Sequence, residues 1–118
     1  MDRKVLQQRT QKFNVNVIHF CNDFPRTPAG FEIAKQLIRS SGSVGANYRA
    51  TVRAKSRADF IYKIQIVLEE ADESLYWLEV VKEAGIKQGQ MLEELLNEAN
   101  QLTAIFAATD KSAKLNSK

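Results

Sequence analysis

The chain has little of the chemistry that enzymes and metalloproteins use. Its 118 residues include one cysteine, Cys21, and one histidine, His19. A single cysteine forms no internal disulfide, which is typical of a protein in a reducing cytoplasm. Two positions apart on a helix, the two side chains point to different faces, so they predict neither a zinc site nor a thiol–imidazole pair. We therefore interpret Cys21 as a small buried apolar residue.

Other catalytic signatures are also missing. No glutamate precedes His19 by three positions, which excludes the Glu-x-x-His pattern of di-iron helical bundles. The sequence has no glycine loop with the spacing that binds phosphates. No run of about 18 apolar residues occurs, and the N-terminus lacks the apolar region of a signal peptide. We expect a cytoplasmic protein with no enzymatic activity, no cofactor or metal and no membrane span.

The residues that are present indicate helices. Two prolines and five glycines divide the chain into four segments, none of which alternates with a period of two. At 118 residues, one domain spanning 1–118 is expected. We predict an all-α fold, an antiparallel up-down-up-down four-helix bundle. The helices are expected at about 3–24, 28–53, 57–84 and 88–108, followed by a frayed basic tail at 109–118.

Periodic apolar residues support the first two helices. In the first, a stripe at spacings of four, three and four ends just before Pro25: Phe13, Val17, Phe20 and Phe24. The second begins with Thr27 as N-cap and Pro28 at the first helical position. Its expected inward face comprises Phe31, Ala34, Leu37, Ile38 and Ser41. Segment 40–46, which contains Gly42 and Gly45, is compatible with a loop or with an unbroken helix that lets a neighbour approach closely.

The third helix carries two apolar lines. The main one repeats at 3-4-3-4-3 spacing: Ile61, Ile64, Leu68, Ala71, Leu75 and Leu78. Phe60, Val67 and Val81 form the second, and Gly85 ends the helix. The bundle interior accounts for one line, so the other predicts a partner subunit. The fourth helix has a single inward line: Leu92, Leu95, Ala99, Leu102 and Phe106.

Charge is distributed unevenly along a chain whose formal net charge is +3. A basic segment, with Arg49, Arg53, Lys55, Arg57 and Lys63, precedes an acidic one, with Glu69, Glu70, Asp72, Glu73, Glu79 and Glu83. In one interpretation the five basic residues contact the phosphates of a nucleic acid. In the other, arginines and carboxylates pair in a polar network or subunit interface. The candidates for that network are Asn47, Arg49, Arg53, Glu69, Glu70, Glu73 and Trp77.

Several motifs together resemble a known family. The segments QLIRSSGSVGANYRA, RAKSRADFIYKI and EEADESLYWLE, followed by EAG, are similar to the 23S rRNA intervening-sequence proteins over about residues 9–108. This resemblance implies a four-helix bundle whose second helix continues through Gly42 and Gly45. It also implies a homopentameric ring around a central channel. A distant relative, the accessory variability determinant of diversity-generating retroelements, works with a reverse transcriptase and binds nucleic acid.

Two functional hypotheses follow. The first is a non-catalytic adaptor that binds RNA, DNA or a ribonucleoprotein, with a reverse transcriptase or another protein as partner. The alternative is a homopentameric scaffold for protein–protein interactions, in which the same charges are used between subunits. A ring allows the basic segment of one subunit to meet the acidic segment of the next.

Overall fold

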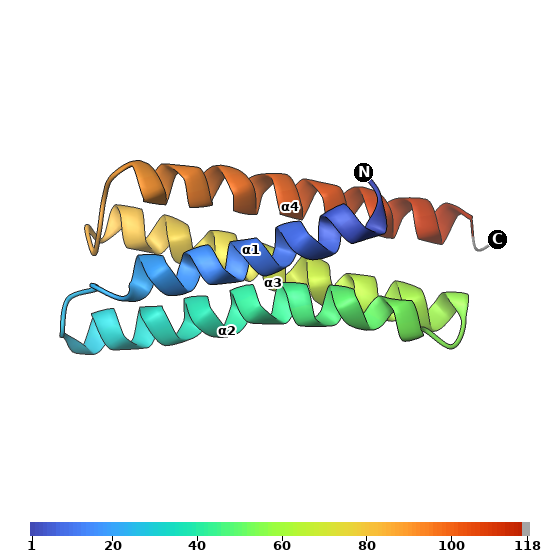
Figure 1. The fold of residues 1–118 in the computed structure, drawn as a ribbon, viewed down its shortest axis with the longest axis horizontal. Helices are drawn as coiled ribbons and strands as arrows, with labels where there is room; N and C mark the ends of the chain where they lie inside the picture. Colours follow the sequence, from blue (N-terminus) through green and yellow to red (C-terminus); the bar gives the residue numbers. More distant parts are fainter. Residues whose placement is uncertain (117–118) are drawn as a thin grey trace.

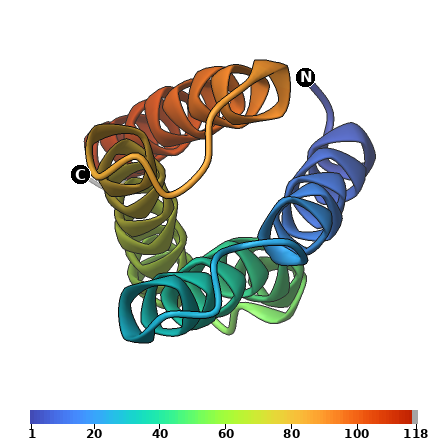
Figure 2. The same cartoon turned by 90° about the vertical axis from the view of Figure 1, so that its left-hand side faces the viewer.

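The computed structural model describes residues 1–116, which form four α-helices and no β-strand. The helices are α1 (Arg3–Cys21), α2 (Pro28–Ala50), α3 (Arg57–Glu83) and α4 (Gln90–Leu115), and a 3₁₀ turn, η1 (Thr51–Arg53), extends α2. Consecutive helices run antiparallel along a molecule 49 Å long (Figure 1). Viewed end-on, each helix lies beside its neighbours in sequence (Figure 2). The all-α prediction is confirmed.

Capping side chains and glycines set the helix ends. Asp2, Thr27 and Ser56 each accept a hydrogen bond from a backbone N–H in the first turn of the following helix. Gly85 adopts a φ of +68°, the left-handed conformation expected after the end of α3. The first helix ends at Cys21 and not at residue 24, because the chain turns before Pro25.

Helix α2 runs unbroken through Gly42 and Gly45, as the family resemblance implied. The small residues let α1 approach closely: a Cβ at Gly45 would lie 3.5 Å from the backbone oxygen of Thr10. Beside this contact, Asn14 Nδ2 donates to Ser41 Oγ at 2.9 Å. Helix continuity here is therefore stabilised by tertiary packing against α1, which overrides the low helix propensity of glycine.

Two glycines of α2 should respond in opposite ways to an added methyl group. In Gly30→Ala the new Cβ would lie 2.0 Å from the backbone oxygen of Pro25, so the α1–α2 connection must shift. We expect a loss of about 1–3 kcal/mol in the free energy of unfolding. In Gly45→Ala the Cβ makes ordinary contacts, and removing a mid-helix glycine should stabilise by about 0.5–1 kcal/mol. Urea denaturation of both variants measures the difference, and equal effects would contradict the packing described for α2.

The buried stripe of α3 differs from both predicted lines. It comprises Ile64, Val67, Ala71, Ser74, Leu78 and Val81, again at 3-4-3-4-3 spacing. Val67 and Val81 therefore belong to the bundle core, while Leu68 and Leu75 are only partly buried at its edge. Ser74 is fully buried, and its hydroxyl donates to Ser40 Oγ of α2 at 2.9 Å. The second apolar line, which predicted a partner subunit, is absorbed within the bundle.

Two further expectations were wrong. Phe31 and Ile38 were expected to face inward, but their side chains are 61% and 39% exposed. Leu37 and Ser41 are buried as predicted, and Ile33, Ser40 and Val44 complete the buried face. The predicted frayed tail is helical as far as Leu115, because Ala113 is buried and Lys114 pairs with Asp110 at 2.9 Å. Residues 117–118 of that tail lie outside the described part of the chain.

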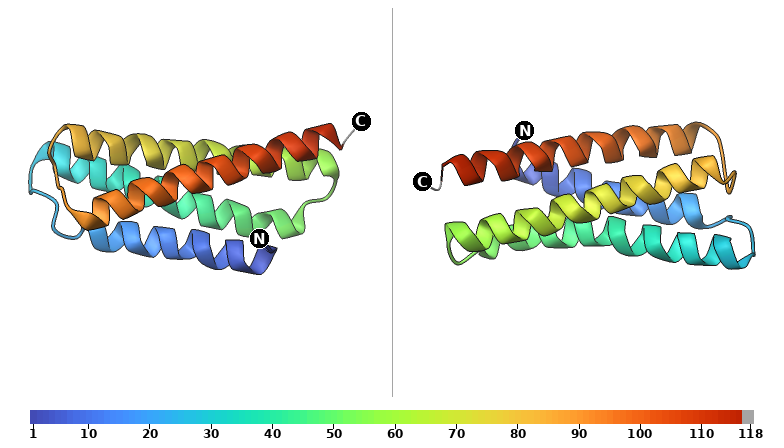
Figure 3. Two further views of the ribbon diagram at one scale, coloured as in Figure 1. Left: turned by 90° about the horizontal axis from the view of Figure 1, so that it is seen from above. Right: turned by 180° about the vertical axis from the view of Figure 1, so that it is seen from behind.

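Helices α1 and α4 contact each other less than the other neighbouring pairs do. Arg9 of α1 bridges the gap with two hydrogen bonds of 2.7 Å to the Glu98 carboxylate of α4. At the far end, Lys87 Nζ contacts the backbone oxygen of Phe20 at 3.0 Å, which aligns the end of α1 with the start of α4. Helix α4 therefore projects beyond the start of α1 at the opposite end of the bundle, as two further views show (Figure 3).

Candidate nucleic-acid interface

The connection between α2 and α3 brings four predicted phosphate-binding residues to one end of the bundle. Arg49 lies in the last turn of α2, Arg53 ends η1, Lys55 lies in the loop, and Arg57 is the first residue of α3. All four are exposed. The loop forms because Ala54 is extended, with ψ of 134°, and Ser56 starts the next helix as its N-cap.

The fifth predicted residue, Lys63, is held in an ion pair. Its Nζ donates to Asp59 Oδ1 at 3.0 Å, one helical turn away. Asp59 also accepts a hydrogen bond from the backbone N–H of Lys55 at 2.9 Å. The pKa of the Asp59 carboxyl is lowered mainly by this backbone hydrogen bond and, to a smaller extent, by the hydrogen bond from Lys63. Lys63 therefore stabilises the start of α3, and its charge is already paired with the Asp59 carboxylate.

This end of the molecule has an excess of positive charge. Segments 1–9, 46–66 and 104–116, which we call the basic end, carry ten Lys and Arg residues against three Asp. The rest of the described chain carries six Lys and Arg against eleven Asp and Glu. A mildly basic protein thus has one strongly basic end, which attracts polyanions by long-range electrostatics.

The acids of the basic end are already engaged. Asp2 caps α1 by accepting from Val5 N–H at 2.8 Å, while Asp59 and Asp110 pair with lysines. Within residues 1–116, by contrast, no hydrogen bond or ion pair forms at these basic side chains: Lys4, Arg49, Arg53, Arg57 and Lys111. Cations without a carboxylate partner remain available for phosphates.

The predicted pairing of Arg49 and Arg53 with Glu69, Glu70 or Glu73 does not form within residues 1–116. Arg39 takes their place: its guanidinium donates to Glu73 and lies 3.3 Å from Glu70. Glu69 is exposed on α3. The reason is geometric, since Arg39 lies opposite the acidic part of α3 in the antiparallel pair, whereas Arg49 lies close to the turn.

Two other members of the predicted network have local roles. Asn47, expected as a buried specificity residue, is partly buried and donates to the backbone oxygen of Ser43, one turn earlier, at 2.9 Å. Trp77 packs against the core, and its indole N–H donates to Glu73 at 3.1 Å. Glu73 therefore accepts hydrogen bonds from both Trp77 and Arg39, which forms a small polar network. The sequence predicted Trp77 and Glu73 as members of this network, but not Arg39.

The pH dependence of the stability lost in Arg39→Ala tests the observed pairing of Arg39 with Glu73. The hydrogen bond from Arg39 is the main reason that the pKa of Glu73 is lowered from its ordinary value of 4.5. A carboxyl with a lowered folded-state pKa contributes stability above its unfolded pKa and loses it as the pH falls through the folded value. We expect Arg39→Ala to destabilise by less than about 1 kcal/mol at pH 7, because the pair is partly exposed.

The stability difference between the wild type and Arg39→Ala should disappear as the pH falls below the ordinary pKa of glutamate and then through the lowered pKa of Glu73. Urea denaturation of both proteins at pH 7 and at successively lower pH measures it. Arg53→Ala is the matched control, because Arg53 has no partner among residues 1–116 and should change stability by less than about 0.5 kcal/mol. A pH-independent effect of Arg39→Ala would contradict the pairing with Glu73.

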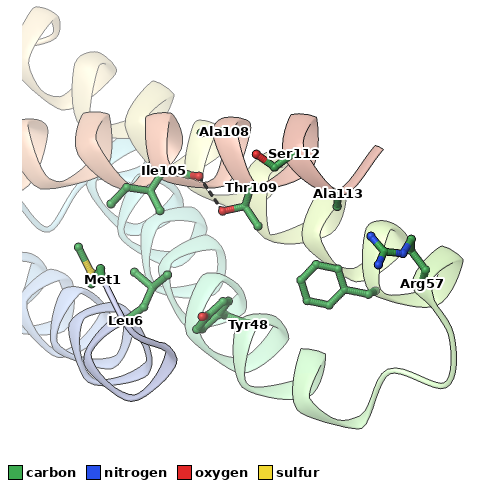
Figure 4. A pocket seen from close by; sticks show the side chains of 10 residues that line it. Met1, Leu6, Tyr48, Arg57, Ile105, Ala108, Thr109, Ser112 and Ala113 are labelled. Atoms are coloured by element: carbon green, nitrogen blue, oxygen red, sulfur yellow. Dashed lines mark hydrogen bonds between the residues drawn. The ribbon is translucent and has the colours of Figure 1, made fainter. Parts of the chain in front are cut away.

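An apolar groove lies next to the exposed arginines. The sequence did not predict this groove. Its volume is about 860 Å³, and it lies between the start of α1, the end of α2, the start of α3 and the end of α4 (Figure 4). Leu6, Tyr48 and Ile105 line it from three helices, and Arg57 lies at its edge. The predicted helix lengths could not have indicated this groove, because the fourth helix was expected to end at residue 108 and to be no longer than the first.

Cys21 and His19, the two side chains considered for catalysis, do not form a catalytic site. Cys21 is buried, and burial raises the pKa of its thiol to about 11, so a reactive thiolate is disfavoured at neutral pH. His19 is exposed on α1. No group of three or more His, Cys, Asp or Glu side chains in residues 1–116 is arranged to hold a metal ion. No helix in this part of the chain is long and apolar enough to cross a membrane.

These features define a four-helix bundle with a basic, grooved end. The chain belongs to the 23S rRNA-intervening sequence protein family, whose model matches residues 2–108. It is similar to a solved crystal structure from Bacteroides thetaiotaomicron VPI-5482, a protein with unknown function from the S23 ribosomal protein family. The two share 31% sequence identity and a TM-score of 0.83, covering 94% of this chain and 99% of that one. Comparison with curated proteins finds no match.

The family assignment confirms the resemblance that the motifs indicated. It adds no biochemical activity, because the similar solved structure is itself of a protein with unknown function. The surface of the molecule, and the basic end in particular, is therefore the basis for a functional proposal.

Proposed function

We propose that the chain is a non-catalytic, self-associating adaptor whose basic end binds RNA. One observation carries this proposal: Arg49, Arg53 and Arg57 are exposed together and have no acidic partner within residues 1–116. Lys55 lies between them in the same connection. Four cations in one connection can neutralise several phosphates of a nucleic-acid backbone, and they recognise it without reading sequence.

Self-association is the second part of the proposal, with a pentameric ring as the expected form. Phe31 and Ile38 support it, because seven residues separate them on the outer face of α2 and both are substantially exposed. In a ring, several basic ends would contact one RNA at the same time and raise its apparent affinity. The competing function, a scaffold without nucleic acid, uses this same apolar face, and its basic residues pair with carboxylates of a neighbouring subunit and not with phosphates.

Sedimentation velocity with a labelled single-stranded RNA distinguishes the two functions. The adaptor predicts an oligomer that carries the RNA with it at low salt, and Phe31→Glu should reduce the oligomer to a smaller species. The matched control is Tyr62→Glu, an equally exposed aromatic residue on α3, which should leave the mass unchanged. An oligomer that never co-sediments with RNA would favour the scaffold, and a wild-type monomer would contradict self-association.

A further inference from the structure

The apolar groove exists because one helix of the bundle is too short. Helix α1 has 19 residues and α4 has 26, and contacts of Lys87 with Phe20 and Asp23 align the two at the opposite end. The difference of seven residues, about 10 Å or two turns, therefore falls at the basic end. There, the faces of α2, α3 and α4 that a longer α1 would cover remain open (Figure 4).

The shape of the groove suits a helix. It continues the line of α1 beyond Leu6, between Tyr48 of α2, Phe60 of α3 and Ile105 of α4. Two helical turns are about 11 Å long, which matches the difference of about 10 Å in length between α1 and α4. Most of the lining is aliphatic or aromatic, and the Thr109 hydroxyl is already bonded to Ile105 O at 2.9 Å. The occupant must therefore present an apolar face.

The edge of the groove selects the charge of that occupant. Arg57 lines the groove, and Lys111 follows on α4 beside the lining residues Ala108 and Ser112. Neither Arg57 nor Lys111 has a carboxylate partner within residues 1–116, and the three acids of this end contact the Val5 N–H, Lys63 and Lys114 instead. A segment with acidic residues beside its apolar stripe is attracted here, whereas a basic one is repelled.

From these observations we propose that the groove is the docking site for an acidic amphipathic helix of a partner protein. The helix supplies the two turns that α1 lacks, with its apolar stripe on Leu6, Tyr48 and Ile105 and its carboxylates toward Arg57 and Lys111. Insertion of the α4 end of a second copy is disfavoured, because that end carries Lys111 and Lys114. This site shares only Arg57 with the proposed RNA site, whose other cations are Arg49, Arg53 and Lys55.

Fluorescence anisotropy with synthetic peptides tests the proposal on the full chain. The probe is a labelled helix of about 15 residues, since shorter peptides are scarcely helical in water. It has leucines at positions i, i+3, i+4 and i+7 and glutamates on both flanks of that apolar stripe. A second peptide replaces glutamate with lysine, and a third keeps the composition but scrambles the order. We expect the acidic amphipathic peptide to bind at least about tenfold more tightly than either.

Two substitutions on α4 locate the binding. Ala108→Trp fills the groove and should weaken the peptide by at least about tenfold, whereas Ala107→Trp, at an exposed position that does not line it, should have no effect. Arg57→Glu, on the exposed edge, provides a second variant that leaves the core intact and should also weaken binding. Circular dichroism melts confirm that each variant is folded.

Four outcomes would overturn the proposal. Equal binding of the scrambled peptide would reduce the effect to charge alone, and equal binding by Ala108→Trp and Ala107→Trp would place the peptide elsewhere. If Ala108→Trp alone lowered the mass of the protein's own oligomer, a second copy would be the occupant. If Ala108→Trp, and not Ala107→Trp, abolished RNA binding, the groove would be part of the RNA-binding site. Retained RNA binding with lost peptide binding supports a separate protein-docking site.

Discussion

Arg49→Glu combined with Arg53→Glu is expected to weaken binding of a single-stranded RNA by about a hundredfold or more. Each substitution removes one phosphate contact and adds a repulsive charge, and about tenfold per site is equivalent to about 1.4 kcal/mol. Both side chains are exposed and without partners in residues 1–116, so the free energy of unfolding should change by less than about 0.5 kcal/mol. Filter binding and urea denaturation measure the two quantities.

A control with the same change in net charge separates local from overall electrostatics. Arg26 and Lys35 are also exposed, but they lie away from the basic end. Arg26→Glu combined with Lys35→Glu should reduce RNA affinity only slightly. An equal loss in both double variants would mean that net charge, and not the α2–α3 connection, attracts the RNA.

Phe106→Ala is expected to have the largest effect on stability, a loss of about 3–5 kcal/mol. The ring of Phe106 is fully buried, and its centroid lies 5.3 Å from that of Tyr48, which lines the apolar groove. Removing it leaves a cavity beneath the groove and withdraws support from the end of α2. Because small domains have about 5–15 kcal/mol of stability in total, this variant should approach the limit of folding.

Tyr62→Ala provides the matched comparison, since it truncates an aromatic side chain that is 62% exposed. Its effect on stability should stay below about 0.5 kcal/mol. Thermal melts followed by circular dichroism measure both variants. Similar losses in the two would contradict the position assigned to Phe106 at the centre of the bundle.

Sequence periodicity predicted the four helices but misplaced the core face of α3. The reason is Ser74, a polar residue at a fully buried position. An apolar count skips Ser74 and chooses Leu75, which rotates the predicted stripe toward the edge of the bundle. Burial of Ser74 is tolerated because its hydroxyl bonds to Ser40 Oγ and to the backbone oxygen of Glu70. A pattern of residue types cannot reveal that compensation.

The partner of the acidic segment could have been found from the sequence. In an antiparallel helix pair, residues equally distant from the turn lie opposite each other. Counted from Ala54, Glu70 lies sixteen residues along, Arg39 fifteen residues back and Arg49 only five. Helix geometry therefore favours Arg39 over Arg49.

The groove was harder to foresee from the sequence, because it depends on where α1 begins and on a C-terminal segment that was expected to be frayed.

The salt dependence of RNA binding tests the central claim most directly. For single-stranded RNA, the logarithm of the affinity falls with the logarithm of salt concentration by about 0.7 per phosphate contact. Contacts from Arg49, Arg53, Lys55 and Arg57 predict a slope of about −3 for the wild type, and Arg49→Ala combined with Arg53→Ala should halve it. The same slope in both proteins, or no binding at low salt, would contradict an RNA site at the basic end.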